Sequence, residues 1–379
     1  MDKTDVVVIG AGMAGASVAW RLAQAGQRVT VLEREAQPGT ESTGRSAAMF
    51  MESYGPVGVR ALTRAGRQFY LHPPVGFTNV PLLHHRPTLY VAMAEQEPAL
   101  KKLQSELAAS SAPLERVGAA RVAQLVPVLR SGRFTAGLYD NDSYDVDVDA
   151  LLQGFLRGAK KCGANVLTET HPVQATADSA GWTLGLSSGA SLQAAVVINA
   201  AGAWADEVAT LFGVRPIGLQ PRRRSAFTFA PPAGVPGVAG WPMTVDVDEQ
   251  WYFKPEVGQL LGSPANADPT TPQDVQPEEL DIAIAIDRIQ TATTMEIRRP
   301  SATWAGLRSF VADGEIVIGF DDKSPHFFWL AGQGGYGIQS AAGASLLASC
   351  LVQHKKLPTE LTHFGVDPAH VSPSRLRRG

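Results

Sequence analysis

The chain has 379 residues, of which 45% are hydrophobic and 18% are charged, and its formal net charge at pH 7 is −3. So few charges indicate a globular chain with a large buried core, and the near balance of charge gives no reason to expect nucleic acid or an anionic membrane as a partner. The length suggests two domains, at roughly 100 to 200 residues each, or one large domain with a subsidiary lobe. No apolar run approaches the roughly 20 residues that a bilayer span needs, so we expect a cytoplasmic protein without a transmembrane segment.

The first 35 residues predict a strand, a helix and a second strand. An apolar run, 6–9, is typical of a strand buried on both faces, and Gly10, Gly12 and Gly15 then fit the pattern G-x-G-x-x-G. The first glycine permits a tight turn, the second admits a pyrophosphate at the helix N-terminus, and the third lets the helix pack on the strand. The second strand ends in Glu33, whose carboxylate can bind ribose hydroxyls and disfavours a 2′-phosphate. These features predict a dinucleotide site for FAD or NAD.

Three later segments favour FAD over NAD. Residues 192–209 predict a strand, a turn and a helix, 314–320 predict a hairpin strand, and 327–350 predict a strand, a glycine-rich turn and a helix of small residues. The positive end of that last helix suits the negative charge of a reduced flavin. An NAD-dependent dehydrogenase would leave the glycine-rich segment without a function.

Two insertions separate the cofactor segments. The first predicts a helix near 56–70, a strand at 87–93 and a helix near 95–109, and the second predicts strands at 224–232, 243–248, 250–255 and 259–264 and a helix over 277–295. Strands at hairpin spacing under one helix favour an antiparallel sheet with one face on the active site. We therefore expect an α/β fold in which a Rossmann-type FAD-binding domain (1–48, 145–214 and 301–379) is interleaved with an α+β second lobe, an antiparallel-sheet substrate domain (49–144 and 215–300).

Some residues are not expected to carry chemistry. Cys162 and Cys350 are too few for a disulfide framework or a metal centre, so we predict no metal site and expect both cysteines to be buried. His84 and His85 stand before a predicted strand and are expected at the surface. The basic C-terminal segment, SRLRRG, is expected to be a solvated tail.

Four further motifs, STGRSAA (42–48), INAAGAW (198–204), WAGLRSF (304–310) and GQGGYGIQ (332–339), give the chain a family resemblance. Together with the N-terminal unit, they make it resemble the FAD enzymes of the glycine oxidase, sarcosine oxidase and D-amino-acid oxidase superfamily almost from end to end. In EREAQPGTESTGRSAA and LGSPANADP the chain is most similar to bacterial D-amino-acid dehydrogenases of the D-arginine dehydrogenase type.

The resemblance implies an extended FAD that is bound without a covalent link, because neither cysteine falls in the segment that tethers FAD in some relatives of sarcosine oxidase. Arg45 could instead be a surface ion pair, but its setting favours a place beside the FAD. The cofactor contacts implied by the resemblance are Gly10, Gly12, Met13, Ala14, Gly15, Glu33, Arg34, Ser42, Thr43, Gly44, Arg45, Ser46, Ala47, Ala48, Val173, Ala201, Gly202, Trp204, Arg308, Gly334, Gly335, Tyr336, Gly337, Ile338 and Gln339.

On the substrate side, the resemblance implies that Arg308, Tyr54 and Tyr252 form the catalytic site and hold the carboxylate of an amino acid, a role that suits a bidentate guanidinium. Arg223 is expected as a second clamp, although the run 222–224 could equally be a solvated strand edge. Met49, Met51, Thr88 and Gly335 complete the expected substrate contacts. The implied reaction is hydride transfer from Cα to flavin N5, which gives an imino acid and then a 2-oxo acid and ammonia.

Two departures from the D-arginine dehydrogenase pattern argue against a cationic substrate. Thr88 stands where those enzymes have a glutamate, and Met49 and Met51 replace a histidine and a threonine. The loss of a carboxylate removes the partner of a desolvated guanidinium, an effect of about 2 to 5 kcal/mol. We therefore expect a D-amino acid with a neutral or apolar side chain rather than arginine or lysine.

Two other functions fit parts of the same pattern. A secondary-amine or N-substituted glycine oxidase would use the same scaffold and a similar carboxylate clamp. A non-catalytic flavin-binding protein would not need Arg308 and the two tyrosines. In each catalytic case the partner is a small-molecule amino acid or amine, and the motifs leave open whether O₂, a quinone or another compound accepts the electrons.

Overall fold

The apolar run at 6–9 lies at the centre of a parallel sheet in the computed structural model, which describes residues 2–108 and 114–377. Strand β1 pairs in parallel with β2 on one side and with β12 on the other, so its side chains are buried on both faces. The strands of this first sheet are β1 (Asp2–Ile9), β2 (Val29–Leu32), β9 (Asn165–Leu167), β10 (Pro172–Asp178), β11 (Gly181–Leu186), β12 (Ser191–Asn199), β19 (Val317–Phe320) and β20 (Phe327–Ala331). The expected α/β fold is confirmed.

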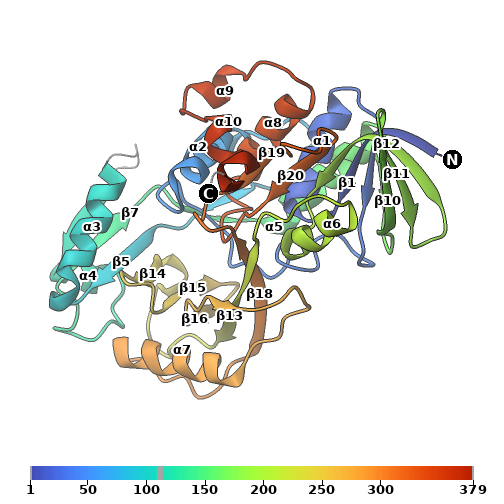
Figure 1. Ribbon diagram of the computed structural model, residues 1–379. Helices are drawn as coiled ribbons and strands as arrows, with labels where there is room; N and C mark the ends of the chain where they lie inside the picture. Colours follow the sequence, from blue (N-terminus) through green and yellow to red (C-terminus); the bar gives the residue numbers. More distant parts are fainter. Residues whose placement is uncertain (1, 109–113, 378–379) are drawn as a thin grey trace.

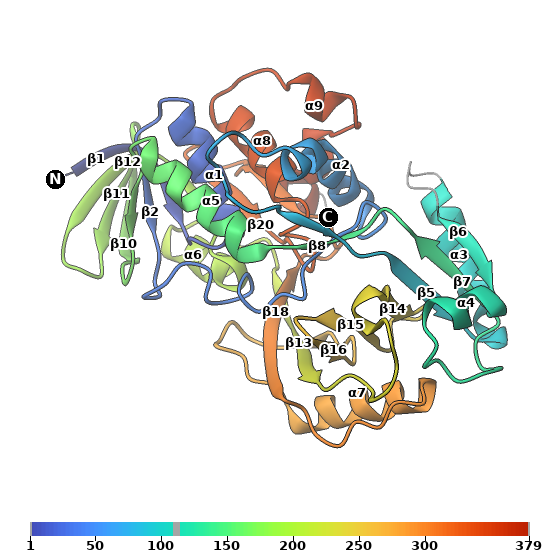
Figure 2. The same cartoon turned by 180° about the vertical axis from the view of Figure 1, so that it is seen from behind.

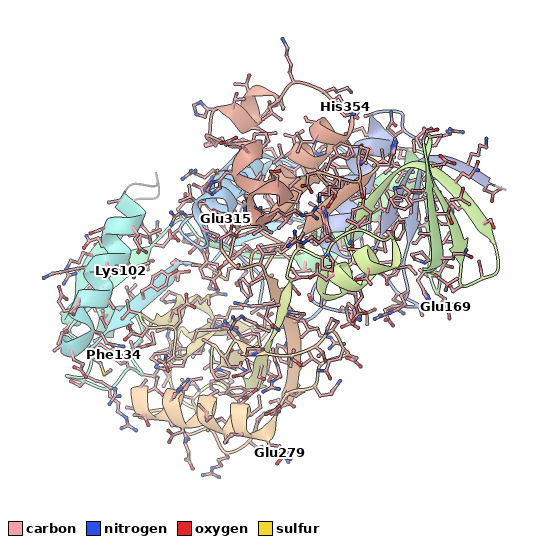
Figure 3. The ribbon with its side chains drawn as sticks, viewed as in Figure 1. Lys102, Phe134, Glu169, Glu279, Glu315 and His354 are labelled. Carbon is pink, nitrogen blue, oxygen red and sulfur yellow. The ribbon has the colours of Figure 1, made fainter. Side chains whose placement is uncertain are left out.

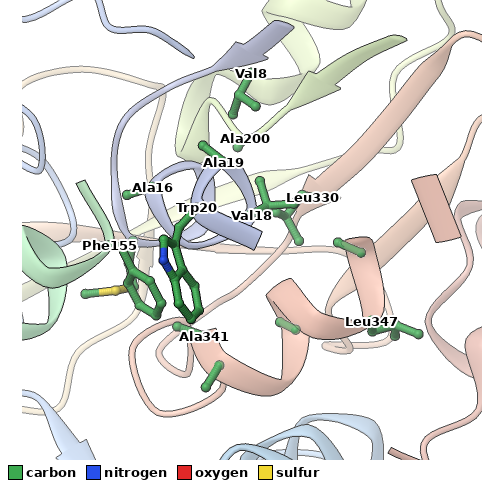
Figure 4. Packing of buried hydrophobic residues seen from close by; sticks show 14 of the residues in the cluster. Val8, Ala16, Val18, Ala19, Trp20, Phe155, Ala200, Leu330, Ala341 and Leu347 are labelled. Carbon is green, nitrogen blue, oxygen red and sulfur yellow. The ribbon is translucent and has the colours of Figure 1, made fainter. Parts of the chain in front are cut away.

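Helices cover one face of this sheet and are visible from both sides of the molecule (Figures 1 and 2). Helix α1 (Met13–Gln24) packs against α5 (Val148–Lys161) and α8 (Ala341–Val352), and α8 packs in turn against α2 (Val57–Leu71). Trp20 fills the space between these helices, with its ring centroid 5.5 Å from that of Phe155 (Figure 4). The other face is covered by α6 (Ala205–Leu211), and the preceding η2 (Gly202–Trp204) packs against β18.

The second large sheet forms most of the other lobe (Figure 1). Its longest ladder pairs β13 with β18 in antiparallel fashion, from Gln220 opposite Phe310 to Thr228 opposite Ala302. Helix α7 (Glu279–Ala292) covers one face of this sheet. The strands are β5 (Thr88–Ala92), β6 (Glu115–Gly118), β7 (Ala136–Asp140), β13 (Gln220–Phe229), β14 (Met243–Asp246), β15 (Tyr252–Glu256), β16 (Gln259–Ser263), β17 (Asp268–Pro269) and β18 (Ala302–Phe310). The expectation of a purely antiparallel sheet was wrong in one respect, because β5 and β14 pair in parallel.

Shorter elements connect the lobes and cover their edges. A small sheet of β3 (Met49–Phe50), β8 (Tyr144–Val146) and β4 (Leu83–His85) lies at the crossing, with His84 and His85 exposed as expected. The helix expected near 95–109 is α3 and ends at Ala108, and its last expected residue lies outside the described residues. The remaining elements are η1 (Ala94–Gln96), α3 (Glu97–Ala108), α4 (Ala119–Leu125), η3 (Val238–Gly240), α9 (Thr359–Thr362), α10 (Pro368–Val371) and η4 (Pro373–Arg377).

Two elements lie in a different lobe from the one that the expected domain boundaries give them. Strand β18, expected in the cofactor domain, is a member of the second sheet because it pairs along its whole length with β13. Helix α2, expected in the substrate domain, contributes Val59, Leu62 and Tyr70 to the core beneath the first sheet. In the described part of the chain, no helix is long and apolar enough to cross a membrane.

The C-terminal segment is docked, so the expectation of a solvated tail was wrong for the residues that can be seen; 378–379 lie outside the described residues. Arg377 forms an ion pair with Asp321 and Arg375 pairs with Asp313. Glu315 joins this segment to α2, since its Oε1 accepts hydrogen bonds from the Gly58 N–H (2.8 Å) and from His370 Nε2 (2.8 Å) (Figure 3). Cys350 is buried but Cys162 is exposed, which corrects the expectation for the second thiol.

Close contact between α2 and α8 predicts a specific loss of stability. A Cβ atom on Gly343 would lie 2.1 Å from the backbone oxygen of Leu62, so Gly343→Ala forces the helices apart. We expect the free energy of unfolding to fall by about 1 to 3 kcal/mol in urea denaturation, because the clash with backbone outweighs the better helix propensity of alanine. The control is Gly240→Ala, where nothing lies within 4 Å. Equal stability of the two variants would contradict the prediction.

Candidate functional site

A cavity of about 380 Å³ runs from the end of β2 to the junction of the two lobes. Most residues expected to contact the cofactor line it, although they come from segments that are far apart in the sequence. These residues are Gly10, Gly12, Met13, Ala14, Glu33, Arg34, Ser42, Thr43, Arg45, Ser46, Ala47, Ala201, Gly202, Trp204, Arg308, Gly334, Gly335, Gly337 and Ile338.

The turn between β1 and α1 has the geometry that the glycine pattern predicts. Gly10 has a φ of +99°, and a Cβ there would lie 2.6 Å from the oxygen of Ala200. A Cβ on Gly15 would lie 1.8 Å from the oxygen of Gly10, so the third glycine serves the packing of helix on strand and does not itself line the cavity. The N-terminus of α1 therefore opens toward the cavity through Gly12.

Glu33 is held in place by backbone groups at one end of the cavity. Its Oε2 accepts a hydrogen bond from the Ala11 N–H (2.8 Å) and its Oε1 accepts one from the Glu35 N–H (2.9 Å). These bonds fix the carboxylate without neutralising its charge, and it still lines the cavity. It is thus oriented to accept further hydrogen bonds from a pair of hydroxyl groups.

Hydrogen bonds attach residues 42–48 to the second lobe. The hydroxyl of Ser42 donates to the oxygen of Leu307 (2.7 Å), and the indole N–H of Trp304 donates to the oxygen of Arg45 (3.1 Å). The Arg45 guanidinium pairs with Asp274 (2.5 Å) and also lines the cavity, so the ion pair is present and a place beside the FAD stays a prediction. Thr43 accepts the Met13 N–H at 3.0 Å, which ties the same segment to the start of α1.

A side pocket of about 60 Å³ opens beside Gly335, where the two lobes meet. Arg308, Tyr252 and Arg224 line both this pocket and the main cavity. Six of the expected substrate contacts line the side pocket together: Met49, Met51, Tyr54, Tyr252, Arg308 and Gly335.

Arg223 does not reach the site, which corrects the expected second clamp. Its guanidinium forms ion pairs with Asp281 (3.0 Å) and with Glu278 on the other side of the sheet. Arg224 lines the pocket instead. The reason is the alternation of side chains along a strand: Arg222 pairs opposite Arg308 on one face, Arg224 shares that face, and Arg223 points away.

Among the residues that the structure describes, the two guanidinium groups in the pocket form no ion pairs. Arg308 NH1 lies 3.3 Å from the Tyr54 hydroxyl oxygen, and Arg224 Nε is buried and has no hydrogen-bond partner in the same part of the chain. Burial, and then the positive charge of Arg308, lower the pKa of the Arg224 guanidinium. Within residues 2–108 and 114–377, no carboxylate lies at ion-pair distance from either group. This combination suits an anionic ligand that enters from the cavity.

Several other expected residues lie elsewhere. Thr88 is fully buried and hydrogen-bonds Ser143 (2.9 Å), so it does not line the substrate pocket. Val173 is 53% exposed, and its neighbours His171 and Pro172 line the cavity in its place.

Four expected cofactor residues act around the cavity rather than in its wall. Gly44 closes a turn by donating its N–H to the oxygen of Gly39 (2.7 Å), and Ala48 and Gln339 line the side pocket. Tyr336 packs edge-on against Tyr54, with ring centroids 5.0 Å apart.

Sequence reasoning missed Arg224, Tyr90, Met243, Val245 and Glu249 among the pocket residues. Alternation along β5 and β14 could have indicated the apolar ones, since Tyr90 pairs opposite Val245. Glu249 has a φ of +53° in an exposed turn between β14 and β15, and no local pattern marks it as a pocket residue.

The residues of the main cavity fit FAD. A fixed carboxylate at one end, the open N-terminus of α1 in the middle and the glycines of 334–337 at the other end match a ribose, a pyrophosphate and a flat ring in turn. Neither cysteine lines either cavity, which favours FAD bound without a covalent link; the mode of attachment stays a prediction.

Comparison with known proteins gives the same result. The DAO family of FAD-dependent oxidoreductases has a model that matches residues 5–350. The chain belongs to this family. The predicted superfamily and its cofactor are confirmed. The narrower resemblance to D-arginine dehydrogenases stays a prediction.

Individual relatives are distant. Glycine oxidase from Bacillus licheniformis is 25% identical over 371 residues, which cover 94% of this chain and 95% of that protein. Human mitochondrial dimethylglycine dehydrogenase is 24% identical over 382 residues, 95% of this chain, but the chain spans only 44% of its length. The structure of L-proline dehydrogenase from P. horikoshii has a TM-score of 0.85 and 20% identity, covers 100% of this chain and 99% of its own, and supports the fold alone.

The position of Glu33 predicts the effect of removing its charge on cofactor affinity. Glu33→Gln keeps the shape but weakens the hydrogen bonds that the residue can accept, so we expect the dissociation constant of FAD to rise by about tenfold or more. Fluorescence of FAD released on dilution measures this directly. The matched control is Glu279→Gln on the outer helix α7 (Figure 3), which is exposed and distant from the cavity. Unchanged affinity in Glu33→Gln would refute the assignment.

Proposed function

We propose that the protein oxidises the amino group of a D-amino acid with a neutral or apolar side chain, and that Arg308 and Arg224 bind the substrate carboxylate. One observation carries the proposal: two guanidinium groups face a cavity beside the expected cofactor position, and neither has a carboxylate partner in the described chain. A buried charge without a partner is costly, and a bound carboxylate offsets that cost.

The remaining polar groups suit the same ligand. Tyr252 is 4% exposed and lines both cavities, while the Tyr54 hydroxyl contacts Arg308. A carboxylate has enough lone pairs to accept from a guanidinium and a phenol together. In this arrangement the four groups fix the position of Cα relative to the expected flavin ring and exclude water, and this orientation is their contribution to the rate.

The wall of the side pocket supports a neutral side chain. Met49, Met51, Met243 and Val245 supply flexible apolar surface, and Thr88 lies outside the pocket. The only carboxylate that lines this pocket among the described residues is that of Glu249, on an exposed turn. The D configuration rests on the resemblance of residues 33–48 to D-arginine dehydrogenases.

FAD, when bound, supplies the oxidising power by accepting a hydride from Cα. The protein need only bind the substrate with its amine neutral and its Cα–H directed at the cofactor. The imino acid that results needs no further group of the protein, because it reacts with water to give a 2-oxo acid and ammonia.

A secondary amine is the second candidate substrate. The relatives named glycine oxidase and dimethylglycine dehydrogenase act, by their names, on glycine and on an N-methylated glycine. An N-substituted glycine would present the same carboxylate to Arg308 and Arg224 and would place its N-substituent in the side pocket. A purely flavin-binding protein would not require these two unpaired arginines.

A substrate panel tests the proposal. D-alanine, D-leucine, D-phenylalanine, D-arginine, the L-enantiomers, glycine, sarcosine and D-proline are each mixed anaerobically with the FAD-loaded protein. We expect the neutral D-amino acids to bleach the flavin absorbance fastest. Faster bleaching by D-arginine would overturn the proposed side-chain preference, faster bleaching by sarcosine would favour the second candidate, and no bleaching at all would exclude an amine-oxidising function. Admission of air then shows whether O₂ reoxidises the flavin.

Two adjacent arginines provide a matched pair of variants. Arg224→Met removes one guanidinium from the pocket, so we expect kcat/KM for the best substrate to fall by at least about 30-fold, mostly through KM, which corresponds to about 2 kcal/mol. Arg223→Met removes the ion pairs to Asp281 and Glu278 on the opposite face, so we expect lower thermal stability with kcat/KM nearly unchanged. Equal effects on KM would contradict the assignment of Arg224 to the substrate.

A further inference from the structure

Gln339 lies at the end of the glycine-rich turn before α8 and is only 2% exposed. Its side-chain amide nitrogen lies 3.1 Å from the oxygen of Met51, 3.0 Å from the oxygen of Tyr54 and 3.2 Å from Thr63 Oγ1. All three are hydrogen-bond acceptors for the amide. Gln339 therefore holds the segment that carries Tyr54 from the side of the cofactor lobe.

Other contacts also hold this segment, since β3 pairs with β8 and Glu52 forms an ion pair with Arg67 (2.9 Å). The Tyr54 N–H donates to the oxygen of Met51 (3.3 Å), and the hydroxyl of Ser53 donates to Asp140 (2.7 Å). In the described part of the chain, the oxygen of Tyr54 receives no other hydrogen bond than that of Gln339. Loss of the amide would leave this carbonyl without a donor and would remove the hydrogen bonds from Gln339 to Met51 and Tyr54.

The glycine-rich turn before α8 also fixes the ring of Tyr54. Tyr336, three residues before Gln339, packs against the Tyr54 ring at an interplanar angle of 66°. Backbone and ring of Tyr54 are thus both placed by 336–339, and the hydroxyl lies 3.3 Å from Arg308 NH1 as a result. The glycine-rich turn lines the cofactor cavity on one side and sets the substrate pocket on the other.

We propose that Gln339 is a positioning residue, which holds Tyr54 against Arg308 and so determines how well the pocket binds a substrate carboxylate. This role differs from the cofactor contact that the resemblance implies for Gln339. The effect on turnover rests on the proposed function, whereas the effect on the 49–56 segment does not.

The test replaces Gln339 by methionine, which has nearly the same length and no N–H group. We expect kcat/KM to fall about 10- to 100-fold, chiefly through KM, with the FAD dissociation constant nearly unchanged. Amide hydrogen–deuterium exchange in a peptide covering 49–56 is expected to quicken in the same variant, with or without substrate. The control is Gln353→Met at the far end of α8, whose amide nitrogen donates to Ser349 within the same helix end.

A double-mutant cycle separates positioning from general loss of structure. If Gln339 acts through Tyr54, the effects of Gln339→Met and Tyr54→Phe on KM are less than additive. Gln339→Glu, which keeps the shape but cannot donate, provides a second variant should the methionine variant fail to fold. Exchange and KM unchanged in either folded variant, or fully additive effects on KM, would overturn the proposal. Failure of the wild type to oxidise any amine would overturn only the proposed function, because the exchange experiment stands without a substrate.

Discussion

The antiparallel ladder between β13 and β18 is the constraint on which the site depends. It extends from the substrate sheet into the space beneath the cofactor lobe, and its register places Arg308 opposite Arg222 with Arg224 on the same face (Figure 1). Two like charges are thus held close together in the pocket, and among the described residues neither has a carboxylate at ion-pair distance, although Glu249 lines the same pocket. Burying two like charges is unfavourable, so the register of the sheet supports the proposal that an anionic ligand binds here.

Local sequence predicted the turn at the start of the cofactor cavity because the contacts of that turn are local. The turn at Gly10, the helix that follows and the position of Glu33 depend on residues within one strand–helix–strand unit. The substrate half depends on strand phase, and a shift of one residue reverses the face that a side chain occupies. Because the phase of β13 was uncertain, the sequence could not show that Arg223 faces its carboxylate partners and that Arg224 faces the pocket.

Long-range packing explains the other differences from expectation. Thr88 begins a strand that passes the pocket, but its hydroxyl finds a buried partner in Ser143, and Tyr90 two residues later lines the pocket instead. Glu249 enters the pocket wall from the turn between β14 and β15, and β14 is placed by its pairing with β5, which is distant in the sequence. No periodic pattern encodes such contacts, because they depend on which segments the fold brings together rather than on the neighbours of a residue in sequence.

The cofactor site and the substrate clamp are joined through one strand rather than through a hinge. Ser42 bonds the oxygen of Leu307, and the next residue along β18 is Arg308. The backbone oxygen that accepts the Ser42 hydrogen bond and the guanidinium therefore belong to adjacent residues of β18. One peptide unit sets the separation of the two residues. Since rigid elements hold functional groups more closely than loops do, the position of the Arg308 guanidinium relative to the cofactor cavity is determined mainly by β18, and Tyr54 contacts that guanidinium from another segment.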